Sequence, residues 1–560
     1  MNLSPERGFR SFFINLVAIA AGAVLFAAVF PNLLFENGLP LLAWIAYVPV
    51  FWVIRRSGFG ACVFWGALYG YGSYGLFNYW LSVFHPLAGL IVGSIYLVFL
   101  AALFPLLKFA AVLYPKRGYI LQWLIWLSFE YLRTKGFLGY AYGISGYSQW
   151  HLTPLIQIAS VTGVWGVSAL LVFPSAWLAA ALPKNMPWSL EGIKTDFLNF
   201  LHRERISALV WTAAFAGVLV FGFVSLVDYQ DAPKAKLALV QHNTDPWAPS
   251  KAPTPKQAFE EYWNDFRILK RLSDEAIAAN PDLDLVVWSE TAFVPRIYWH
   301  LTVRDDHYSY LLVRELLDYL STQRVPFVIG NDDARKDPAL NPQGNNQVDY
   351  NAVLLFEGEE IKQLYRKQRL VPFTEHFPYE KQLPFIYDAL IKADTHFWEK
   401  GKEATVFAST NPQGLFGSQE KGALKFSSPI CFEDTFGYLS RDFVRNGAEL
   451  IVNLTNDAWS GSLPAQMQHL SMAVFRAVEN RRSMVRSTAS GQTCAIDPNG
   501  RILAMARPFA ETWLAVEVPV VKVSSLYTRL GDLLPRVFMV LAFFLLILPA
   551  VQGIMRVVKK

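Results

Sequence analysis

Long apolar runs at both ends of the chain constrain its fold more than any other feature. A run of about 20 residues that is almost free of charge is long enough to cross a bilayer as a helix. Eight such spans are predicted, near residues 11–31, 38–54, 60–83, 88–114, 119–133, 160–182, 206–226 and 533–555. The chain is 53% hydrophobic and 17% charged, which also departs from the average of soluble proteins. We therefore expect an α-helical transmembrane bundle of about eight spans.

The charged residues concentrate between the seventh and eighth spans. This pattern predicts a transmembrane region over residues 1–229, a soluble domain over 230–525 and a last span within 526–560. The first apolar run is longer than the core of a signal peptide and is followed at once by another apolar run, so we interpret it as an uncleaved span.

Basic residues are distributed unevenly over the short segments between spans. Lys and Arg are retained on the cytoplasmic side of a membrane. One set of alternate segments contains only Arg133 and Lys135, whereas the other contains thirteen basic residues: Arg7, Arg10, Arg55, Arg56, Lys116, Arg117, Lys184, Lys194, Arg203, Arg205, Arg556, Lys559 and Lys560. We therefore expect both chain ends inside and residues 230–525 outside.

Strand-like and helix-like stretches alternate within residues 230–525. Apolar runs of strand composition occur at 236–242, 283–289, 325–331, 350–356, 424–430, 448–455, 483–490 and 513–520. Helical stretches are expected at about 255–279, 306–322, 437–446 and 465–481. Repeated alternation of this kind is typical of an α/β layered domain.

Three ionisable side chains stand at the ends of such runs. Glu290 lies in VVWSETAF, Lys367 precedes Glu375 by eight positions, and Cys431 lies between an apolar run and an acidic turn. Functional groups of α/β folds gather at strand ends. A cysteine acts as a nucleophile only when its surroundings ionise it or take its proton. Glu290, Lys367 and Cys431 are therefore predicted to form a catalytic triad.

Each of these residues also has a structural explanation when it is taken alone. A lone cysteine after a strand is usually a small buried hydrophobe. Glu290 could be an acid at a helix N-terminus, and Lys367, beside Arg366 and Arg369, could belong to a solvated basic face. The catalytic interpretation depends on the three residues occurring together.

The order Glu, Lys, Cys resembles the nitrilase superfamily over about residues 236–521. The segments KQRLVPFTEHFP, PICFED and LIVNLTNDAWSG narrow the resemblance to the apolipoprotein N-acyltransferases. It implies a nitrilase-like α-β-β-α sandwich for the soluble domain. It also implies that Glu290 is the general base, Lys367 the oxyanion-stabilising residue and Cys431 the nucleophile.

The resemblance further implies a reaction and a location. A phospholipid, expected to be phosphatidylethanolamine, would acylate Cys431 as a thioester, and the acyl chain would pass to the N-terminal amine of a diacylglyceryl lipoprotein. The enzyme would be a monomer in a bacterial inner membrane, with its catalytic domain in the periplasm. The sequence has no cysteine and histidine cluster of the kind that binds zinc and no basic stripe for nucleic acid, so no cofactor, metal or nucleic acid is expected.

Further residues are assigned to the site from their positions. Glu375, Glu433, Phe432 and Trp459 are expected to support the triad. Aromatic side chains favour membrane interfaces, so exposed aromatics in the loop 376–398 and nearby could form a lid or bind substrate. The assigned ones are Trp247, Phe373, Phe377 and Tyr387. Burial of several of them in the core is the alternative.

Glu130 lies near the end of the fifth span, where an acid is costly unless it is paired. Arg133, three residues later, is a local partner at helical spacing. A structural clamp and a role in guiding lipid are both consistent with this position.

Two other functions remain open from the sequence. A membrane-tethered amidase could use the same triad with water as the acceptor and a small periplasmic amide as the substrate. A non-catalytic lipoprotein-binding or transport component would use the spans instead, but the intact triad and the lack of a charged pathway through the spans argue against it.

Overall fold

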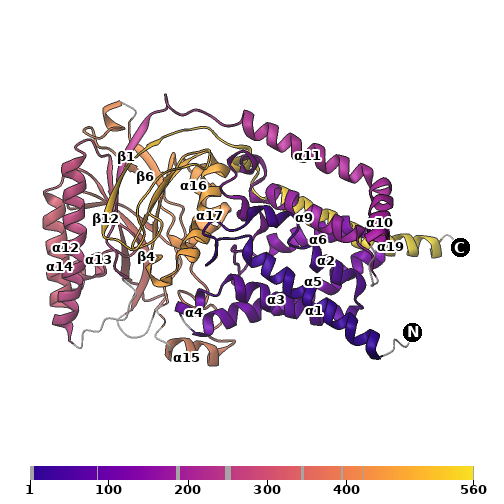
Figure 1. Ribbon diagram of the computed structural model, residues 1–560. Coiled ribbons are helices and arrows are strands. Elements are labelled where there is room, and N and C mark those ends of the chain that lie inside the picture. The colour runs from indigo at the N-terminus through magenta and orange to yellow at the C-terminus, as the bar shows by residue number, and fades with distance from the viewer. Residues whose placement is uncertain are drawn as a thin grey trace. The chain divides into compact units, whose positions relative to one another are not determined.

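The computed structural model describes residues 5–84, 86–184, 190–245, 254–341, 346–392, 395, 397–419 and 422–558. The chain divides into two compact units, whose elements are labelled in Figure 1. The helical unit comprises Met1–Leu226, Met467–Ser471 and Leu530–Lys560. The sheet unit comprises Val227–Gln466 and Met472–Arg529.

The helical unit is built almost wholly from apolar helices. Its elements are α1 (Pro5–Ala28), η1 (Pro40–Trp44), α2 (Val48–Arg56), α3 (Phe59–Phe77), α4 (Leu81–Phe84), α5 (Pro86–Leu113), α6 (Gly118–Leu132), η2 (Ser145–Gln149), α7 (Thr153–Ile156), α8 (Ala159–Thr162), α9 (Val164–Ala181), α10 (Leu190–Arg203), α11 (Arg205–Val224) and α19 (Leu533–Val558). Helices satisfy their own backbone hydrogen bonds, which is why such apolar segments fold this way in lipid.

Four helices of the described chain are long and apolar enough to cross a membrane. They are Phe9–Ala28, Leu87–Leu113, Val164–Ala181 and Arg205–Val224, and Leu533–Pro549 is a shorter apolar helix. The predicted count of eight spans is not confirmed. The second predicted span is divided into η1 and the nine-residue α2, which at 1.5 Å per residue is too short to cross the hydrocarbon core by itself.

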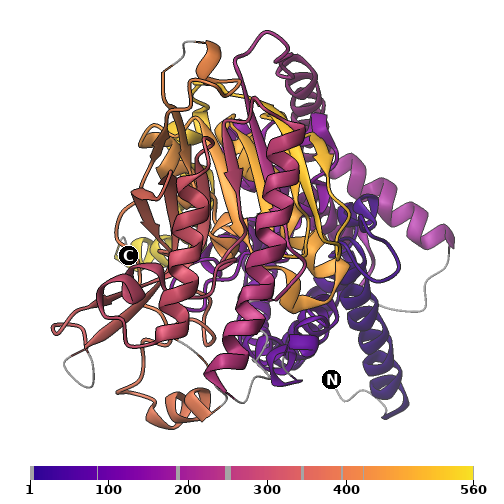
Figure 2. The same ribbon diagram turned by 90° about the vertical axis from the view of Figure 1, so that its left-hand side faces the viewer.

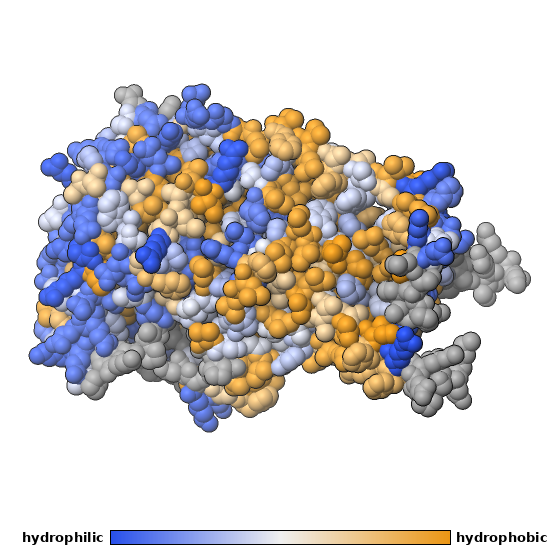
Figure 3. Space-filling view, in the orientation of Figure 1, coloured by the Kyte–Doolittle hydropathy of each residue, from blue (hydrophilic) through white to orange (hydrophobic). Residues whose placement is uncertain are grey.

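Apolar side chains are exposed over much of the helical unit (Figure 3). On α11, for example, Leu209, Val220 and Phe223 are each more than 60% exposed. Large exposed apolar surfaces mark contact with lipid or with another protein. Together with the long apolar helices, this surface makes the chain a membrane protein.

Basic residues of the two predicted sets lie at different levels of the bundle. Arg55 donates to the carbonyls of Ala179 and Leu182, and Lys108 Nζ donates to the Arg55 carbonyl at 2.9 Å. Arg133, from the other set, donates to Tyr96 Oη at 2.8 Å. Lys108 and Tyr96 lie on the same helix, α5, about 18 Å apart along its axis. Arg55 and Arg133 therefore lie at different levels of the helical unit, and the orientation of the chain stays a prediction.

Glu130 and Arg133 are both buried, but they find different partners. Glu130 Oε1 accepts from the Ser145 hydroxyl at 2.5 Å and from the Ser145 N–H at 3.2 Å. Arg133 donates to Tyr96 Oη and to the carbonyls of Tyr140 and Tyr142. Within the described chain no ion pair joins Glu130 to Arg133, so the predicted direct pairing is wrong. A hydroxyl and backbone groups replace it because η2 and the preceding loop reach both side chains.

The sheet unit contains two six-stranded sheets. The first has the order β12-β1-β2-β3-β4-β5 and the second β11-β10-β9-β8-β7-β6. The strands are β1 (Lys234–Gln241), β2 (Leu285–Val287), β3 (Phe327–Lys336), β4 (Gln347–Glu357), β5 (Glu360–Arg366), β6 (Phe407–Ser409), β7 (Leu424–Ser427), β8 (Leu450–Thr455), β9 (Ser483–Thr488), β10 (Cys494–Ile496), β11 (Ile502–Met505) and β12 (Thr512–Pro519). β1, β2 and β3 are mutually parallel, as are β7, β8 and β9, and the outer strands are antiparallel.

The two sheets pack face to face around a shared apolar core. Along β1, Leu237 and Leu239 enter the core between the sheets, whereas Ala238 and Val240 enter a second core under helices. This alternation follows from the two-residue period of a strand. The central strands of the first sheet are therefore buried on both faces, which explains why residues 237–240 of β1 and all of β2 are apolar.

Helices cover the outer faces of this sandwich. α12 (Pro255–Ala279) and α14 (His307–Ser321) lie over the first sheet, as Figure 2 shows. α16 (Gly437–Arg445) and α17 (Leu463–Asn480) lie beside the second sheet in Figure 1. The remaining helical elements are α13 (Ile297–Thr302), α15 (Pro384–Lys392), α18 (Leu526–Leu530), η3 (Gly417–Gln419), η4 (Cys431–Thr435) and η5 (Ala458–Ser460). The layers are α-β-β-α, as the resemblance implied.

The orientation of the chain can be tested by cysteine labelling in cells. Ser321, at the end of α14, and Thr195, in α10, are both exposed and lie in segments predicted to face opposite sides of the membrane. In a Cys431→Ala background, we expect a membrane-impermeant maleimide to label Ser321→Cys in intact spheroplasts. Thr195→Cys should be labelled only after permeabilisation. The reverse pattern would contradict the predicted orientation.

Candidate active site

The predicted catalytic residues lie just after the ends of three strands in the sheet unit. Glu290 follows β2, Lys367 follows β5, and Cys431 follows β7 as the first residue of η4. Lys367 Nζ lies 3.1 Å from Glu290 Oε1. Glu290, Lys367 and Cys431 interact electrostatically, so the structure places the three predicted residues in one cluster.

Lys367 is a fully buried cation between two carboxylates. Its Nζ donates to Glu290 Oε1 at 3.1 Å and to Glu375 Oε1 at 2.8 Å, and its side chain has no exposed surface. Burial by itself lowers the pKa of Lys367, but the charges of Glu290 and Glu375 outweigh it and raise the pKa well above its usual value. Lys367 therefore remains charged inside the protein.

Both oxygens of Glu290 are held by the surrounding chain. Oε1 also accepts from Asn351 Nδ2 at 2.8 Å, and Oε2 accepts from the backbone N–H of Asn456 at 2.9 Å. Glu290 is 2% exposed. A carboxylate oxygen has two lone pairs, so Oε2 retains one for a further proton or donor.

Glu375 completes the charged cluster from the segment after β5. Its Oε2 accepts from the Val371 N–H at 2.8 Å while its Oε1 accepts from Lys367. Burial raises the pKa of Glu375, and Lys367 partly offsets that rise. Glu375 is therefore a second carboxylate partner of the Lys367 ammonium beside Glu290.

Cys431 adopts a backbone conformation that is rare for a side chain of its kind. Its φ is +47°, in the left-handed region, and its side chain is partly exposed whereas Cys62 and Cys494 are buried. Residues held in such conformations cluster at functional sites. Burial, followed by the negative charge of Glu290, raises the pKa of the Cys431 thiol well above its usual value. The resting thiol is therefore neutral at pH 7, and its ionisation needs a base.

Glu433 connects the nucleophile turn, η4 with Cys431, to the residues that directly follow Lys367. Its carboxylate accepts from the backbone N–H groups of Gln368, Arg369 and Ile430 at 2.7, 2.9 and 2.8 Å. It also accepts from Tyr365 Oη at 2.8 Å and has no exposed surface. Removal of this carboxylate would leave several buried donors without an acceptor, so Glu433 fixes the geometry of the cluster.

The other predicted site residues are placed around the cluster with different exposures. Phe432 is buried and packs edge-on against Phe436 at 5.0 Å, and Trp459 in η5 is half-buried. Trp247 lies outside the described residues. The supporting roles of Phe432 and Trp459 stay predictions.

The expected exposed aromatics of the loop 376–398 are only partly exposed. Phe377 is 6% exposed and packs against Phe373, whose φ is +66°, so the expectation that Phe377 is exposed is wrong. Tyr387 is half-buried against Phe397. α15, which includes Tyr387, has no fully buried side chain, and its Phe385 is 68% exposed. Among the described residues of this loop, the exposed large apolar side chains are Tyr379, Phe385 and Ile391. The role of the loop as a lid remains a prediction.

Two functional residues were not found from the sequence. Asn351, on β4, orients Glu290, and Tyr365, on β5, binds Glu433. The signal for Asn351 was a single amide in the otherwise apolar run YNAVLLF, because buried polar side chains require partners. Tyr365 gives no comparable signal, since aromatic residues are common in strands.

Family models match both parts of the chain. The carbon-nitrogen hydrolase model matches residues 236–527, and the model of the apolipoprotein N-acyltransferase N-terminal domain matches residues 21–177. The first match covers the sandwich and the second the helices that precede it.

Curated relatives match the chain over nearly its full length. Apolipoprotein N-acyltransferase 1 of Treponema denticola is 43% identical over 537 residues, covering 94% of each chain. Apolipoprotein N-acyltransferase 1 of Treponema pallidum is 46% identical over 560 residues, covering 98% of each chain. A relative from Geobacter metallireducens is 32% identical and covers 92% of this chain and 91% of its own. This protein therefore belongs to the apolipoprotein N-acyltransferase family and carries a carbon-nitrogen hydrolase unit.

Proposed function

We propose that this protein transfers a fatty acyl chain from a phospholipid to the N-terminal amine of a diacylglyceryl-cysteine lipoprotein, through a thioester on Cys431. The observation that carries the proposal is the buried Lys367 ammonium between Glu290 and Glu375, at the strand ends that also present Cys431. Membership of the family supports the lipoprotein acceptor. The donor is proposed to be phosphatidylethanolamine and the enzyme a monomer in a bacterial inner membrane, with the sheet unit in the periplasm.

The first half-reaction acylates the enzyme. Glu290 Oε2 takes the thiol proton, and the Cys431 thiolate attacks the ester carbonyl of the phospholipid. The ester C–O bond breaks, a C–S bond has formed, and the proton leaves with the lysophospholipid hydroxyl. A base is required in this step because the surroundings of Cys431 disfavour the free thiolate.

Lys367 stabilises the charge that develops on the carbonyl oxygen. An ammonium has three N–H donors, and Glu290 and Glu375 accept from two of them. The third remains for the oxyanion, and the backbone N–H of Phe432 is proposed as a second donor. Lys367 is already oriented by two carboxylates, so little reorganisation is needed in the transition state.

The second half-reaction releases the acyl chain as an amide. The neutral N-terminal amine of the lipoprotein attacks the thioester carbonyl and gives a proton to Glu290. The C–S bond then breaks, and that proton returns to sulfur as the thiol reforms. The reaction is balanced without a metal or redox partner.

Intact mass of the purified protein distinguishes transfer from hydrolysis by an amidase-like site. With phosphatidylethanolamine alone, we expect a stable acyl adduct whose mass falls back when a diacylglyceryl peptide is added. Release of free fatty acid with no adduct and no peptide product would support hydrolysis instead.

Substitution of the nucleophile should abolish the adduct. We expect Cys431→Ala and Cys431→Ser to lower turnover at least about 10³-fold, because a serine hydroxyl is much harder to ionise with the same base. Cys494→Ala is the matched control, since Cys494 is a free, buried cysteine on β10. An adduct that persists on Cys431→Ala would assign the nucleophile to another residue.

Replacement of Glu290 and replacement of Glu375 should impair different steps of the reaction. Glu290→Gln removes the base, so we expect no adduct in a single-turnover assay. Glu375→Gln leaves the base and one partner of Lys367, so the adduct should form slowly and overall transfer should fall more. Glu403→Gln, at an exposed position, is the control and should behave as the unchanged protein. Adduct formation by Glu290→Gln at the normal rate would exchange the assigned roles.

A further inference from the structure

Arg486 is a buried cation that the proposed reaction does not use. It lies on β9 and has no exposed surface. A charge removed from water is costly unless opposite charges and hydrogen bonds compensate it. The groups that bind Arg486 therefore indicate its role in the sheet unit.

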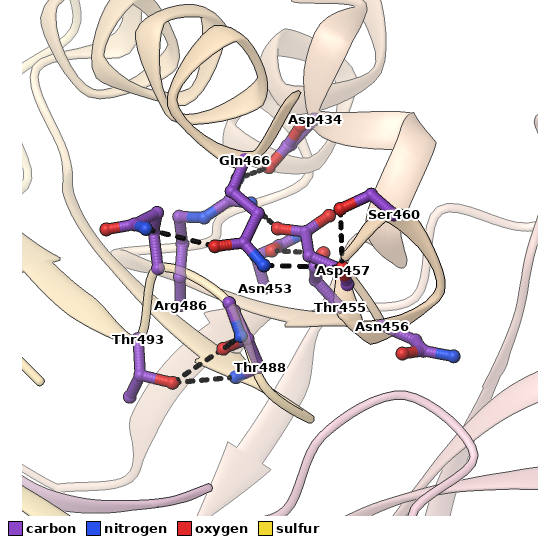
Figure 4. A network of polar contacts seen from close by, with 12 residues as sticks. Asp434, Asn453, Thr455, Asn456, Asp457, Ser460, Gln466, Arg486, Thr488 and Thr493 are labelled. Atoms are coloured by element: carbon purple, nitrogen blue, oxygen red, sulfur yellow. Dashed lines mark hydrogen bonds and ion pairs between the residues drawn. The ribbon is translucent and has the colours of Figure 1, made fainter. Parts of the chain in front are cut away.

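One guanidinium contacts carboxylates on two different loops of the sheet unit. Arg486 Nη1 pairs with Asp434 Oδ2, and its Nη2 lies 3.4 Å from Asp457 Oδ2. Figure 4 shows Arg486 between these two side chains. Asp434 and Asp457 are both buried, so these interactions are not screened by solvent.

Both loops carry parts of the proposed catalytic machinery. Asp434 lies in η4, three residues after Cys431. Asp457 directly follows Asn456, whose N–H donates to Glu290 Oε2. Arg486 thus connects the turn that presents the nucleophile with the loop that holds the base.

The Asp457 loop is also restrained by a hydrogen bond within the loop and by its close packing against Gly491. Ser460 Oγ donates to the Asp457 carbonyl at 2.9 Å, and a side chain at Gly491 would lie 2.7 Å from Asp457 Cβ. The loop therefore has little room to move while Arg486 binds it. Without the guanidinium, two buried carboxylates would remain and repel each other.

We propose that Arg486 is a positioning residue that fixes the nucleophile turn and the Asn456–Asp457 loop relative to each other. The planar guanidinium can address two carboxylates at once, which an ammonium on a flexible stem cannot do in the same geometry. This inference rests on the proposed function of Cys431 and Glu290.

The charge of Arg486 also affects Cys431. The groups that act on the thiol are Glu290, Lys367, Asp457 and Glu375, and Arg486 in turn interacts with Cys431. Asp457 raises the pKa of Cys431, so removal of the compensating guanidinium should raise it further. Neutralisation of Asp457 should lower it.

The test compares Arg486→Lys with Arg482→Lys, a second buried arginine whose guanidinium binds the carbonyls of Ala448 and Val523 instead. We expect Cys431 of the Arg486→Lys variant to be acylated by phosphatidylethanolamine at least about tenfold more slowly. The reason is that a lysine ammonium cannot contact Asp434 and Asp457 at the same time in this geometry. Arg486→Met should shift the pH midpoint of Cys431 alkylation by iodoacetamide upward, and Asp457→Asn should shift it downward. Arg482→Lys should change neither quantity.

Normal acylation and an unshifted midpoint in folded Arg486 variants would overturn the positioning role. If those variants do not fold, Asp434→Asn preserves the shape of the side chain and must still slow acylation for the proposal to stand. Persistence of the adduct on Cys431→Ala would instead refute the proposed function, so the two failures are distinguishable.

A second inference concerns a cavity within the helical unit. It is lined by Tyr69, Trp126, Glu130 and Arg133, among others, and leaves about 10 Å³ for the centre of a water-sized molecule. Space on the order of 10 Å³ is what one water requires.

Each of these four side chains carries a buried polar atom with no hydrogen-bond partner among the described residues. The atoms are Tyr69 Oη, Trp126 Nε1, Glu130 Oε2 and Arg133 Nη2. Glu130 Oε2 can only accept, whereas Trp126 Nε1 and Arg133 Nη2 can only donate. A water molecule can donate to the first and accept from the others.

We infer that this cavity is a water-binding site, in which an ordered water links Glu130 to Arg133. The water replaces the direct ion pair that the chain does not form and satisfies charges that would be costly in an apolar bundle.

Hydroxyl-radical footprinting by X-ray radiolysis detects such waters through oxidation of the residues beside them. In the purified protein we expect Tyr69, which is 1% exposed, to be oxidised well above background. Trp65, 3% exposed and outside the cavity lining, is the control and should stay at background. Background labelling of Tyr69 would show a dry cavity and overturn the inference.

Discussion

The geometry of the sheet unit depends on one buried cation. Lys367 has no contact with solvent, so its charge is tolerated only because Glu290 and Glu375 lie within 3.1 Å of its ammonium. Each carboxylate is in turn fixed by a backbone N–H, from Asn456 and from Val371. Any loop movement would separate opposite charges in a low-dielectric interior, where such separation is expensive. The strand ends are therefore held in place by the same groups that are proposed to react.

The environment of Cys431 follows from this arrangement. Burial raises the pKa of the Cys431 thiol, and the nearby carboxylates, led by Glu290, raise it further, so the thiol rests in its neutral form. A neutral thiol oxidises and alkylates slowly, because the thiolate is the reactive species. Cys431 has a positive φ, and Glu433 fixes the turn by accepting from the Ile430 N–H. We therefore expect Cys431 to react mainly when a bound substrate allows its proton to pass to Glu290.

Sequence reasoning succeeded where periodicity and local order carry the information. The predicted helices at 255–279 and 306–322 correspond to α12 and α14, and the α-β-β-α layers are confirmed. Strands β5, β6 and β11 were missed, because all three are edge strands, which carry a weak apolar signal. The partner of Glu130 was predicted from helical spacing, but a hydroxyl fifteen residues away binds it. Spacing within one helix does not reveal competitors that tertiary structure brings closer.

Arg476 and Glu479 also show what spacing along a helix does not reveal. Three positions apart on α17, they have the spacing of an ordinary surface pair, and they do pair at 3.1 Å. Both are 1% exposed, however, and Arg476 also donates to the Thr435 carbonyl at the end of the nucleophile turn. The spacing alone therefore does not show whether such a pair is exposed, because it carries no information about burial. A charge pair's contribution changes with its surroundings, so buried pairs such as this one fix a turn that a solvated pair would leave free.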